Sequence, residues 1–308
     1  MKWTKLHNDR SSRGFASIVA MMAGVIAMAL TGATGAWAGT PLGPDAQLFG
    51  MLASDSVALA HSSTVSDVSQ APASPEVDAG TADIAGPTSY LTGDLITSSA
   101  MGPAISLGNY DTVVGKCVTG GGTILTGTGA ACSGYDSSGT NALLTTLSNA
   151  QSDVASYASY LAGLTPTLIL GDITLKKYQR LTVKLGAGVN VVSIGNITTA
   201  GGNTIMLSAP NGAVAVINVS GTLDLGAGTQ VFATASGLNP HNVVWNIESA
   251  NPTFGAGVTL RGTVINVASG TTVTFAGRSA IIGALLTDGA VVANGAMHLN
   301  FWPFTAAP

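Results

Sequence analysis

The chain has 308 residues, of which 46% are hydrophobic, 8% are charged and 40 are glycine. So much apolar sequence can fill a core, which excludes a disordered chain, and so little charge excludes an ordinary charged helical bundle. The formal net charge is −4, although four of the eleven bases lie in the first thirteen positions. The other bases are few and scattered, so we expect no binding to nucleic acid. The composition favours one β-rich domain with small residues facing solvent.

Residues 1–38 have the layout of a secretory signal peptide. Basic residues precede an apolar run from Phe15 to Leu30, and small residues then lead to Ala36, Trp37 and Ala38. Sixteen apolar residues are short for a membrane span, so we predict cleavage after Ala38 and a secreted or cell-surface protein. An uncleaved membrane anchor is the alternative. No later segment is apolar enough to span a bilayer, so we expect no membrane contact after cleavage.

Residues 39–86 are rich in Ser, Ala, Asp and Pro and show no sustained strand or helix periodicity. We predict a flexible leader here, with a short helix around Leu48 to Leu59 as its one regular element. After Pro87 the chain changes to short β-prone pieces separated by glycines. The main domain is therefore predicted to span residues 87–308.

The two cysteines, Cys117 and Cys132, lie fifteen positions apart. An exported chain reaches an oxidising compartment, so we predict a disulfide between them, which would stabilise the fold by about 3 kcal/mol. A metal site is the alternative, and it lacks the paired cysteines and neighbouring histidines that such sites use.

One segment, residues 141–164, breaks the β pattern. Its apolar residues recur at intervals of three and four, as on one face of a helix, and the opposite face is polar. Thr140 or Asn141 can cap its start, while Gly163 and Pro166 can end it. We expect this helix to lie along a hydrophobic surface, because a single apolar stripe is unstable in water.

Short β-prone segments recur about every twenty residues in the C-terminal half. The segments 242–247, 262–267 and 283–288 form one such series, and 253–261, 272–280 and 291–299 form a second. This spacing predicts a right-handed β-solenoid in which each period forms one coil, with the long helix packed alongside. An immunoglobulin-like sandwich is the alternative, but it does not require equal spacing.

The same half of the chain resembles a known family. The segments that carry the resemblance are, in order, residues 209–221, 242–247, 262–275, 281–295 and 298–304. They resemble the choice-of-anchor A adhesive domain of bacterial surface proteins, which is similar to the microbial ice-binding domain. The resemblance covers Ser89 to Phe304 and implies an ice-binding-like β-solenoid with a long helix alongside and an adhesive role. It leaves the ligand open.

The sequence offers little for catalysis. Glycoside cleavage needs two carboxyl groups about 5 to 9.5 Å apart. Between Leu181 and Pro308 only six residues are charged, and Asp224 and Glu248 sit in different sequence contexts. Nucleotide-binding, zinc and nucleophile motifs are absent as well. We therefore expect neither an enzyme nor a cofactor, and a carbohydrate-active β-helix enzyme is the least favoured alternative.

Threonines on the predicted strands suggest a binding surface instead. Stacked coils would present alternate residues on a flat, uncharged face at a repeat of about 4.8 Å. The candidate residues are Thr198, Thr222, Thr259, Thr263, Thr272 and Thr274. We favour an adhesive or structural solenoid that binds extracellular matrix, a glycan or a cell surface. The alternative is an ice-binding protein that uses a Thr-rich face, although no regular T-x-T array is present and threonine is also a common outward strand residue.

Overall fold

The computed structural model describes residues 42, 49–54, 56–59, 62–67, 76–79, 81–84, 89–92, 94–233, 238–248, 251–268, 270–302 and 304. All of them belong to residues 32–308, the second of the two units into which the chain divides. The predicted signal peptide, residues 1–38, lies outside the described residues. Within them, no helix has the length and apolar character needed to cross a membrane.

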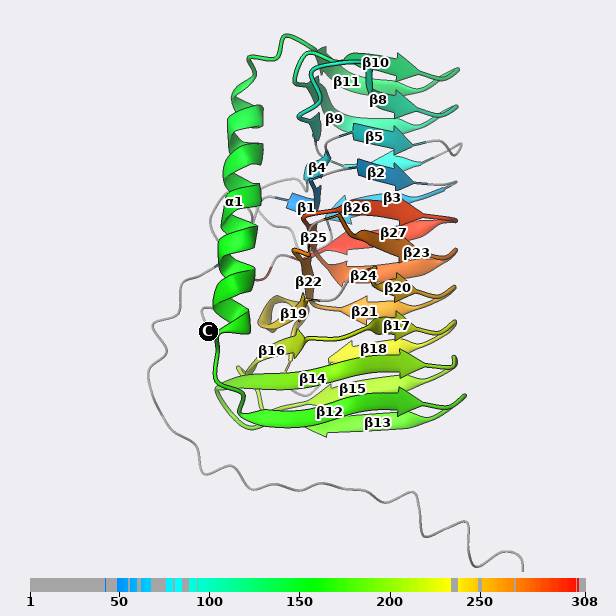
Figure 1. Ribbon diagram of the computed structural model, residues 1–308. Helices are drawn as coiled ribbons and strands as arrows, with labels where there is room; N and C mark the ends of the chain where they lie inside the picture. Colours follow the sequence, from blue (N-terminus) through cyan, green and yellow to red (C-terminus); the bar gives the residue numbers. More distant parts are fainter. Residues whose placement is uncertain are drawn as a thin grey trace, which may run out of the picture. The chain divides into compact units, whose positions relative to one another are not determined.

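The described strands form one continuous parallel sheet that is wound into stacked coils (Figure 1). Each full coil contributes one strand to each of three faces, which we name A, B and C. Face A contains β16 (Val214–Val219), β19 (Val243–Ile247), β22 (Thr263–Asn266), β25 (Leu285–Thr287), β1 (Phe49–Ala53), β4 (Glu76–Ala79) and β7 (Leu95–Thr97).

Faces B and C repeat the same stacking. Face B contains β17 (Leu223–Leu225), β20 (Thr253–Phe254), β23 (Thr272–Phe275), β26 (Ala290–Ala293), β2 (Ser56–Leu59), β5 (Thr81–Ile84), β8 (Pro103–Leu107) and β10 (Thr123–Thr126). Face C contains β13 (Arg180–Lys184), β15 (Thr204–Ser208), β18 (Gln230–Ala233), β21 (Thr259–Arg261), β24 (Ser279–Gly283), β27 (Met297–Phe301), β3 (Thr64–Asp67) and β6 (Tyr90–Leu91).

Four longer strands turn a corner of the solenoid. β12 (Leu168–Leu175) and β14 (Val189–Thr199) run from face A to face B. β9 (Thr112–Thr119) and β11 (Ala131–Asp136) run from face C to face A. A short 3-10 helix, η3 (Pro240–Asn242), precedes β19. The predicted β-solenoid is confirmed.

The stacking order differs from the order along the chain. The first described strands, β1 to β3, lie in the middle of the stack. The strands that follow them add successive coils as far as β10 and β11 at one end. Helix α1 (Ala142–Ala162) then leads back along face A to β12 at the other end (Figure 1). From β12 the coils return to the middle, where β25, β26 and β27 pair with β1, β2 and β3. We call this junction the seam.

The seam corrects the predicted flexible leader. The described residues between 49 and 84 form β1 to β5, so the leader, the short helix near Leu48 to Leu59 and the domain boundary at residue 87 are wrong. Every residue of β1 is buried, and such a strand shows no alternation of apolar and polar residues in the sequence. Its partner on one side is β25, more than two hundred residues away in the chain. Local periodicity contains no information about such a partner.

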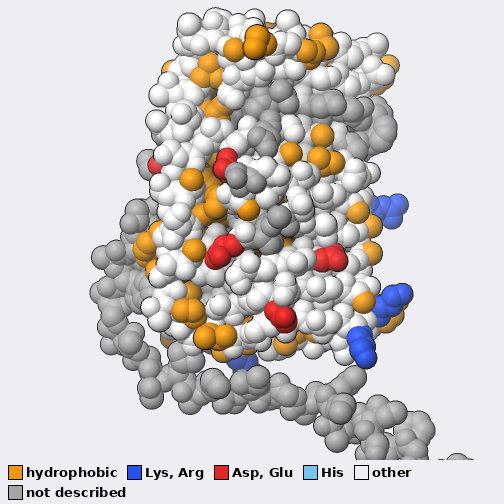
Figure 2. Space-filling model, viewed as in Figure 1, with side chains coloured by type: hydrophobic (Ala, Val, Ile, Leu, Met, Phe, Trp, Pro, Cys, Tyr) orange, Lys and Arg blue, Asp and Glu red, His pale blue; other side chains and the backbone are white. Residues whose placement is uncertain are grey.

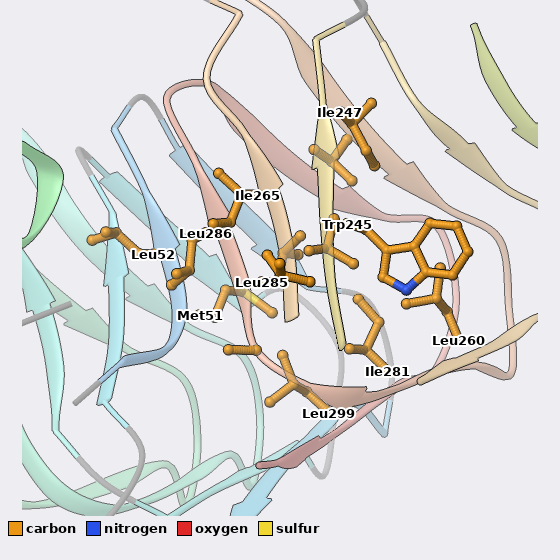
Figure 3. Close-up of a cluster of buried hydrophobic side chains, with 14 of the residues drawn as sticks. Met51, Leu52, Trp245, Ile247, Leu260, Ile265, Ile281, Leu285, Leu286 and Leu299 are labelled. Atoms are coloured by element: carbon orange, nitrogen blue, oxygen red, sulfur yellow. The ribbon is translucent and has the colours of Figure 1, made fainter. Parts of the chain in front are cut away.

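The core at the seam is apolar and closely packed. Met51 and Leu52 from β1 lie beside Leu285 and Leu286 from β25 (Figure 3). Trp245, the largest fully buried side chain, satisfies its indole N–H by donating to the carbonyl of Arg261 at 3.0 Å. Continuous stacking of such side chains supplies the hydrophobic stabilisation of the solenoid.

Helix α1 lies within the range predicted for it, and it packs against face A. Its buried residues are Leu147, Ala150, Val154, Tyr157, Ala158 and Leu161, all of which belong to the predicted apolar stripe. Asn141 caps the first turn by accepting the N–H of Leu143 at 3.0 Å, and Gly163 follows the last turn. The side-chain amide of Asn141 also donates to the Asp136 carboxylate of β11 at 2.7 Å. The start of the helix is therefore fixed to the end of the sheet.

The predicted disulfide between Cys117 and Cys132 is confirmed. It joins β9 to its sheet neighbour β11, the last strand before the helix, with the two Cα atoms 6.0 Å apart. The bridge therefore closes the coil at which the sheet ends and the helix begins.

The corner between faces B and C uses one repeated backbone conformation. Residues at this corner have φ between +60° and +72°, and the N–H of most of them donates to a carbonyl of the next coil. They are Tyr178, Gly202, Gly228, Gly257, Arg278, Tyr110 and Gly129. Glycine adopts this left-handed conformation without steric cost, so a tyrosine here is an exception.

Candidate binding face

Face B presents a straight column of outward residues, one from each coil. The strand registers place them directly above one another, and we call them the central column: Thr174, Thr198, Asp224, Thr253, Thr274, Val292, Ala58, Ser106 and Leu125. The backbone of Asp83 holds the register position between Ala58 and Ser106. Neighbouring members are one strand spacing apart, about 4.8 Å. The face therefore offers a regular array of mostly small side chains.

The half of this column nearest β12 is rich in threonine. Thr174 and Thr198 are exposed, while Thr253 and Thr274 are partly exposed. Asp224 interrupts the row, and its Oδ1 accepts a hydrogen bond from the Thr253 hydroxyl at 2.5 Å. One charged side chain thus lies within the threonine array.

A second row, two residues earlier in each coil, is held by asparagine amides. The Oδ1 of Asn196 accepts the backbone N–H of Thr222 at 2.8 Å. The Oδ1 of Asn251 accepts the backbone N–H of Thr272, also at 2.8 Å. Each bond joins one coil to the next, so the row is fixed in position before any ligand arrives.

The six predicted threonines do not share one surface. Thr198, Thr222, Thr272 and Thr274 lie on face B, as one binding surface requires. Thr259 lies on face C in β21, and Thr263 is fully buried on face A in β22. Alternation along the sequence indicates that a residue lies on a strand, but it does not distinguish the three faces of a solenoid.

Sequence reasoning missed other members of the array. Thr174 and Thr253 lie in the central column, and Asn196 and Asn251 lie in the row beside it. Thr174 and Thr253 could have been found from the sequence, because each lies about one coil length before another threonine of the column, Thr198 or Thr274. That offset varies between coils, since Thr198 pairs with Asp224 but Thr253 pairs with Thr274.

The other half of the central column contains fewer hydroxyl groups, and Asp83 holds one register position in it. It contains Val292, Ala58, Ser106 and the half-exposed Leu125. In the space-filling view, uncharged surface predominates, acidic side chains are isolated, and lysine and arginine gather at one edge (Figure 2). Face B is thus mainly uncharged, and its threonine array covers only part of its length.

The whole solenoid matches a family model. Residues 51–299 match the model of a family described as "Putative Ice-binding-like adhesive domain". The chain belongs to this family. The match starts within β1 and ends within β27, so the ice-binding-like adhesive domain includes the seam and the strands that the sequence had suggested were a leader.

Solved structures with a similar fold have low sequence identity. An ice-binding protein from the Antarctic ascomycete Antarctomyces psychrotrophicus is 18% identical, with coverage of 85% of this chain and 99% of that chain and a TM-score of 0.48. A glycosylated ice-binding protein from an Arctic yeast is 18% identical, with coverage of 88% and 97% and a TM-score of 0.48. An ice-binding protein from an Antarctic biological consortium is 16% identical, with coverage of 90% and 95% and a TM-score of 0.49. No curated protein matches the chain.

The described part of the ice-binding-like adhesive domain contains no cluster of His, Cys, Asp and Glu residues suited to a metal ion. Two acidic residues in and beside the threonine array, Asp172 and Asp224, form hydrogen bonds within the structure. The Oδ1 of Asp172 accepts the backbone N–H of Asn196 at 2.8 Å, and Asp224 accepts from Thr253. His298 lies on face C, where its Nδ1 is 2.8 Å from the Thr64 hydroxyl. The contacts of Asp172 and Asp224 therefore make these two carboxylates parts of the array.

Proposed function

We propose that this protein is an exported, non-catalytic adhesive solenoid that binds an extracellular ligand through face B. The observation that carries the proposal is the regular central column, in which mostly uncharged side chains stand one strand spacing apart. A broad regular face suits a repeating partner such as extracellular matrix, a glycan or the surface of another cell. Membership in the ice-binding-like adhesive family supports the same function.

Several features make face B suitable for such contact. Hydrogen bonds between coils fix its side chains, so little conformational entropy is lost when a ligand binds. Low charge means that few ions or tightly held waters must be displaced. The polar groups that remain are hydroxyls and amides, which can donate and accept hydrogen bonds to sugar or peptide groups.

Export is the part of the proposal that rests on residues 1–38 alone. The basic start, the apolar run and the Ala36 to Ala38 end occur in the order of a signal peptide. N-terminal sequencing of the exported protein should therefore begin at Gly39. Recovery of the intact chain from the membrane fraction would show that the segment is an anchor.

The adhesion test compares two faces of the same molecule. We expect beads coated with the exported protein to adhere to matrix-coated or cell-coated surfaces. The double variant T198K/T274K adds two bulky charges to the central column and should reduce adhesion at least tenfold. The matched variant T204K/T259K, on face C, should adhere like the native protein. Equal losses in both variants, or no loss in either, would refute face B as the contact surface.

Ice binding is the second candidate, and the threonine half of the central column favours it. Four threonines at one strand spacing, interrupted by Asp224, present hydroxyl and methyl groups in a regular row. An ice-affinity assay and a recrystallisation assay on the native protein test this function. Ice binding would be established if the native protein is retained in the ice fraction and the variant T198K/T274K is not. Exclusion from ice together with adhesion to surfaces would support the first candidate.

A further inference from the structure

Basic side chains gather on the end coil formed by β12 and β13. Lys176, Lys177, Arg180 and Lys184 are all exposed there, and they are four of the seven bases that follow residue 38. The same coil has one acidic residue, Asp172, which is hydrogen-bonded to the neighbouring coil. Within the described residues, none of the four cations is joined to a carboxylate. These four bases lie close together in the sequence, between residues 176 and 184, so they correct the expectation that the bases of the mature chain are scattered.

An exposed aromatic ring stands among these cations. Tyr178 is 83% exposed and adopts φ of +61°, a left-handed conformation that is uncommon for a tyrosine. A Cβ atom placed on Gly202 of the next coil would lie 2.6 Å from the ring carbons Cδ1 and Cε1 of Tyr178. One face of the ring therefore covers Gly202, and the rest of the ring is available to a ligand.

The backbone fixes this tyrosine in place. Its N–H donates to the carbonyl of Gly201 at 3.1 Å, and the amide of Gln179 accepts the N–H of Lys176 at 2.6 Å. The turn between β12 and β13 is therefore ordered, and the ring is held outward. A left-handed backbone at a non-glycine residue costs about 1–3 kcal/mol, and such strain is found most often at ligand-binding sites.

Protection of the sheet edge does not explain the whole arrangement. Lysines often lie on edge strands, where their charge prevents pairing with another sheet. However, β10 lies at the opposite end of the stack and contains no charged residue. Edge protection also gives no reason for a solvent-exposed tyrosine between two pairs of bases.

We propose that the corner formed by Lys176, Lys177, Tyr178 and Arg180, with Lys184 further along β13, binds an acidic polysaccharide. The carboxylates of such a chain would meet the ammonium and guanidinium groups, and a sugar ring would stack on the exposed tyrosine face. Arg180 and Lys184 are four residues apart on one strand, about 13 Å, so a polymer with repeated charges can contact both. We call this surface the lysine–tyrosine corner.

The observations favour this partner over two other polyanions. A nucleic acid requires a longer row of cations, because its phosphates are closely spaced. An anionic membrane requires apolar side chains that insert beside the cations. The other large exposed apolar residue of this coil, Ile169, lies near the start of β12, on the stretch that belongs to face A.

The test measures the affinity of the exported protein for polygalacturonate, with dextran as the uncharged comparison. We expect binding to polygalacturonate alone, weakening as salt is added. The variant K176Q/K177Q/R180Q should lose about tenfold in affinity, because each exposed ionic contact contributes modestly. The variant Y178N should lose about fivefold, since asparagine tolerates the left-handed backbone while removing the ring.

The other end of the solenoid supplies the matched controls. Tyr110 has φ of +60° and is 61% exposed, and a Cβ atom on Gly129 would lie 2.7 Å from its ring. It therefore repeats the geometry of Tyr178 without neighbouring lysines, so Y110N should bind polygalacturonate like the native protein. R278Q, which removes a cation from the same corner elsewhere in the stack, should also leave affinity unchanged.

Three results would overturn the proposal: equal affinity of native protein and variants, equal binding to dextran, or tighter binding to duplex DNA or anionic vesicles than to polygalacturonate. The corner begins two residues after Thr174, at the end of the central column, and it contains none of the column's residues, so it goes beyond the proposed function. T198K/T274K should retain polygalacturonate binding even if it abolishes adhesion. Failure of one proposal is therefore distinguishable from failure of the other.

Discussion

Two asparagines connect the sheet to the end of helix α1. The side-chain amide of Asn218 donates to the carbonyl of Leu161 at 2.8 Å, and that of Asn246 donates to the carbonyl of Ala158 at 3.2 Å. Asn246 also donates to the Oδ1 of Asn218 at 3.0 Å, so adjacent coils are linked as well. Leu161 lies in the last turn of α1, where carbonyls have no ordinary partner within the helix, and the Asn218 amide supplies a donor there. Asn246 adds a donor about one turn earlier, at Ala158. Nothing in the sequence distinguishes these asparagines from those in turns.

We therefore expect N218A to be strongly destabilising. The change leaves buried polar groups without their partner, which costs about 1–3 kcal/mol. Thermal unfolding followed by circular dichroism should show a clear fall in Tm. N294A, at an exposed position, is the control and should leave Tm nearly unchanged. Equal Tm values for the two variants would show that the amide does not hold the helix.

Asp136, at the start of helix α1, makes the stability of the folded protein depend on pH. The backbone N–H of Ser138 and the side-chain amide of Asn141 donate to its carboxylate and hold its pKa below the ordinary value of 3.8. A lowered pKa in the folded state contributes stability above the unfolded pKa, and this contribution is lost as pH falls through the folded value. Chemical denaturation from pH 7 to pH 2 should show this loss in the native protein. If D136N shows the same pH dependence, another group is responsible.

At the scale of elements, the helix was predictable and several strands were not. The apolar stripe of α1 is a local signal, because its residues recur every three or four positions, and the structure buries them. Strands such as β1 are buried throughout and obtain their partners from the far end of the chain. The same limit applies to the binding face: the sequence identified threonines on strands, while only the register shows that Thr259 and Thr263 lie elsewhere.

Packing of the helix against face A should be essential for stability. Replacing Leu147 or Val154 with Asp buries an unpaired carboxylate, which costs on the order of several kcal/mol unless the site opens to water. We expect a large fall in Tm from either change. Aspartate at the exposed positions Ser148 or Ser156 should be mild. Small, equal effects at all four positions would contradict the observed packing.

At the scale of the whole molecule, the pairing at the seam makes β1, β2 and β3 part of the domain. Strands β1, β2 and β3 pair with β25, β26 and β27 on one side and with β4, β5 and β6 on the other. In most repeat proteins, residues near a chain end lie at an end of the stack and contact one neighbour. Here the first described coil has neighbours on both sides. Local composition, rich in Ser and Ala, cannot reveal such pairing.

We expect strands β1 to β5 to resist proteolysis like the rest of the solenoid. Cleavage requires local unfolding, and strands buried within a stack open rarely. Thermolysin digestion followed by mass spectrometry should leave this segment attached in the native protein. M51D, which places a charge at a fully buried position of the seam, should make it sensitive. Early release of a fragment that begins near residue 87 in the native protein would restore the leader hypothesis.

The seam also sets the order in which the protein can be completed. The ribosome makes β1, β2 and β3 first, but their partners β25, β26 and β27 are the last strands of the sheet to be made. Until then, one edge of the first coil stays open, and open sheet edges attract other chains. Contacts so distant in sequence also slow folding. A chain that leaves the cell before its last strands pair can therefore complete its fold only after the entire domain has emerged.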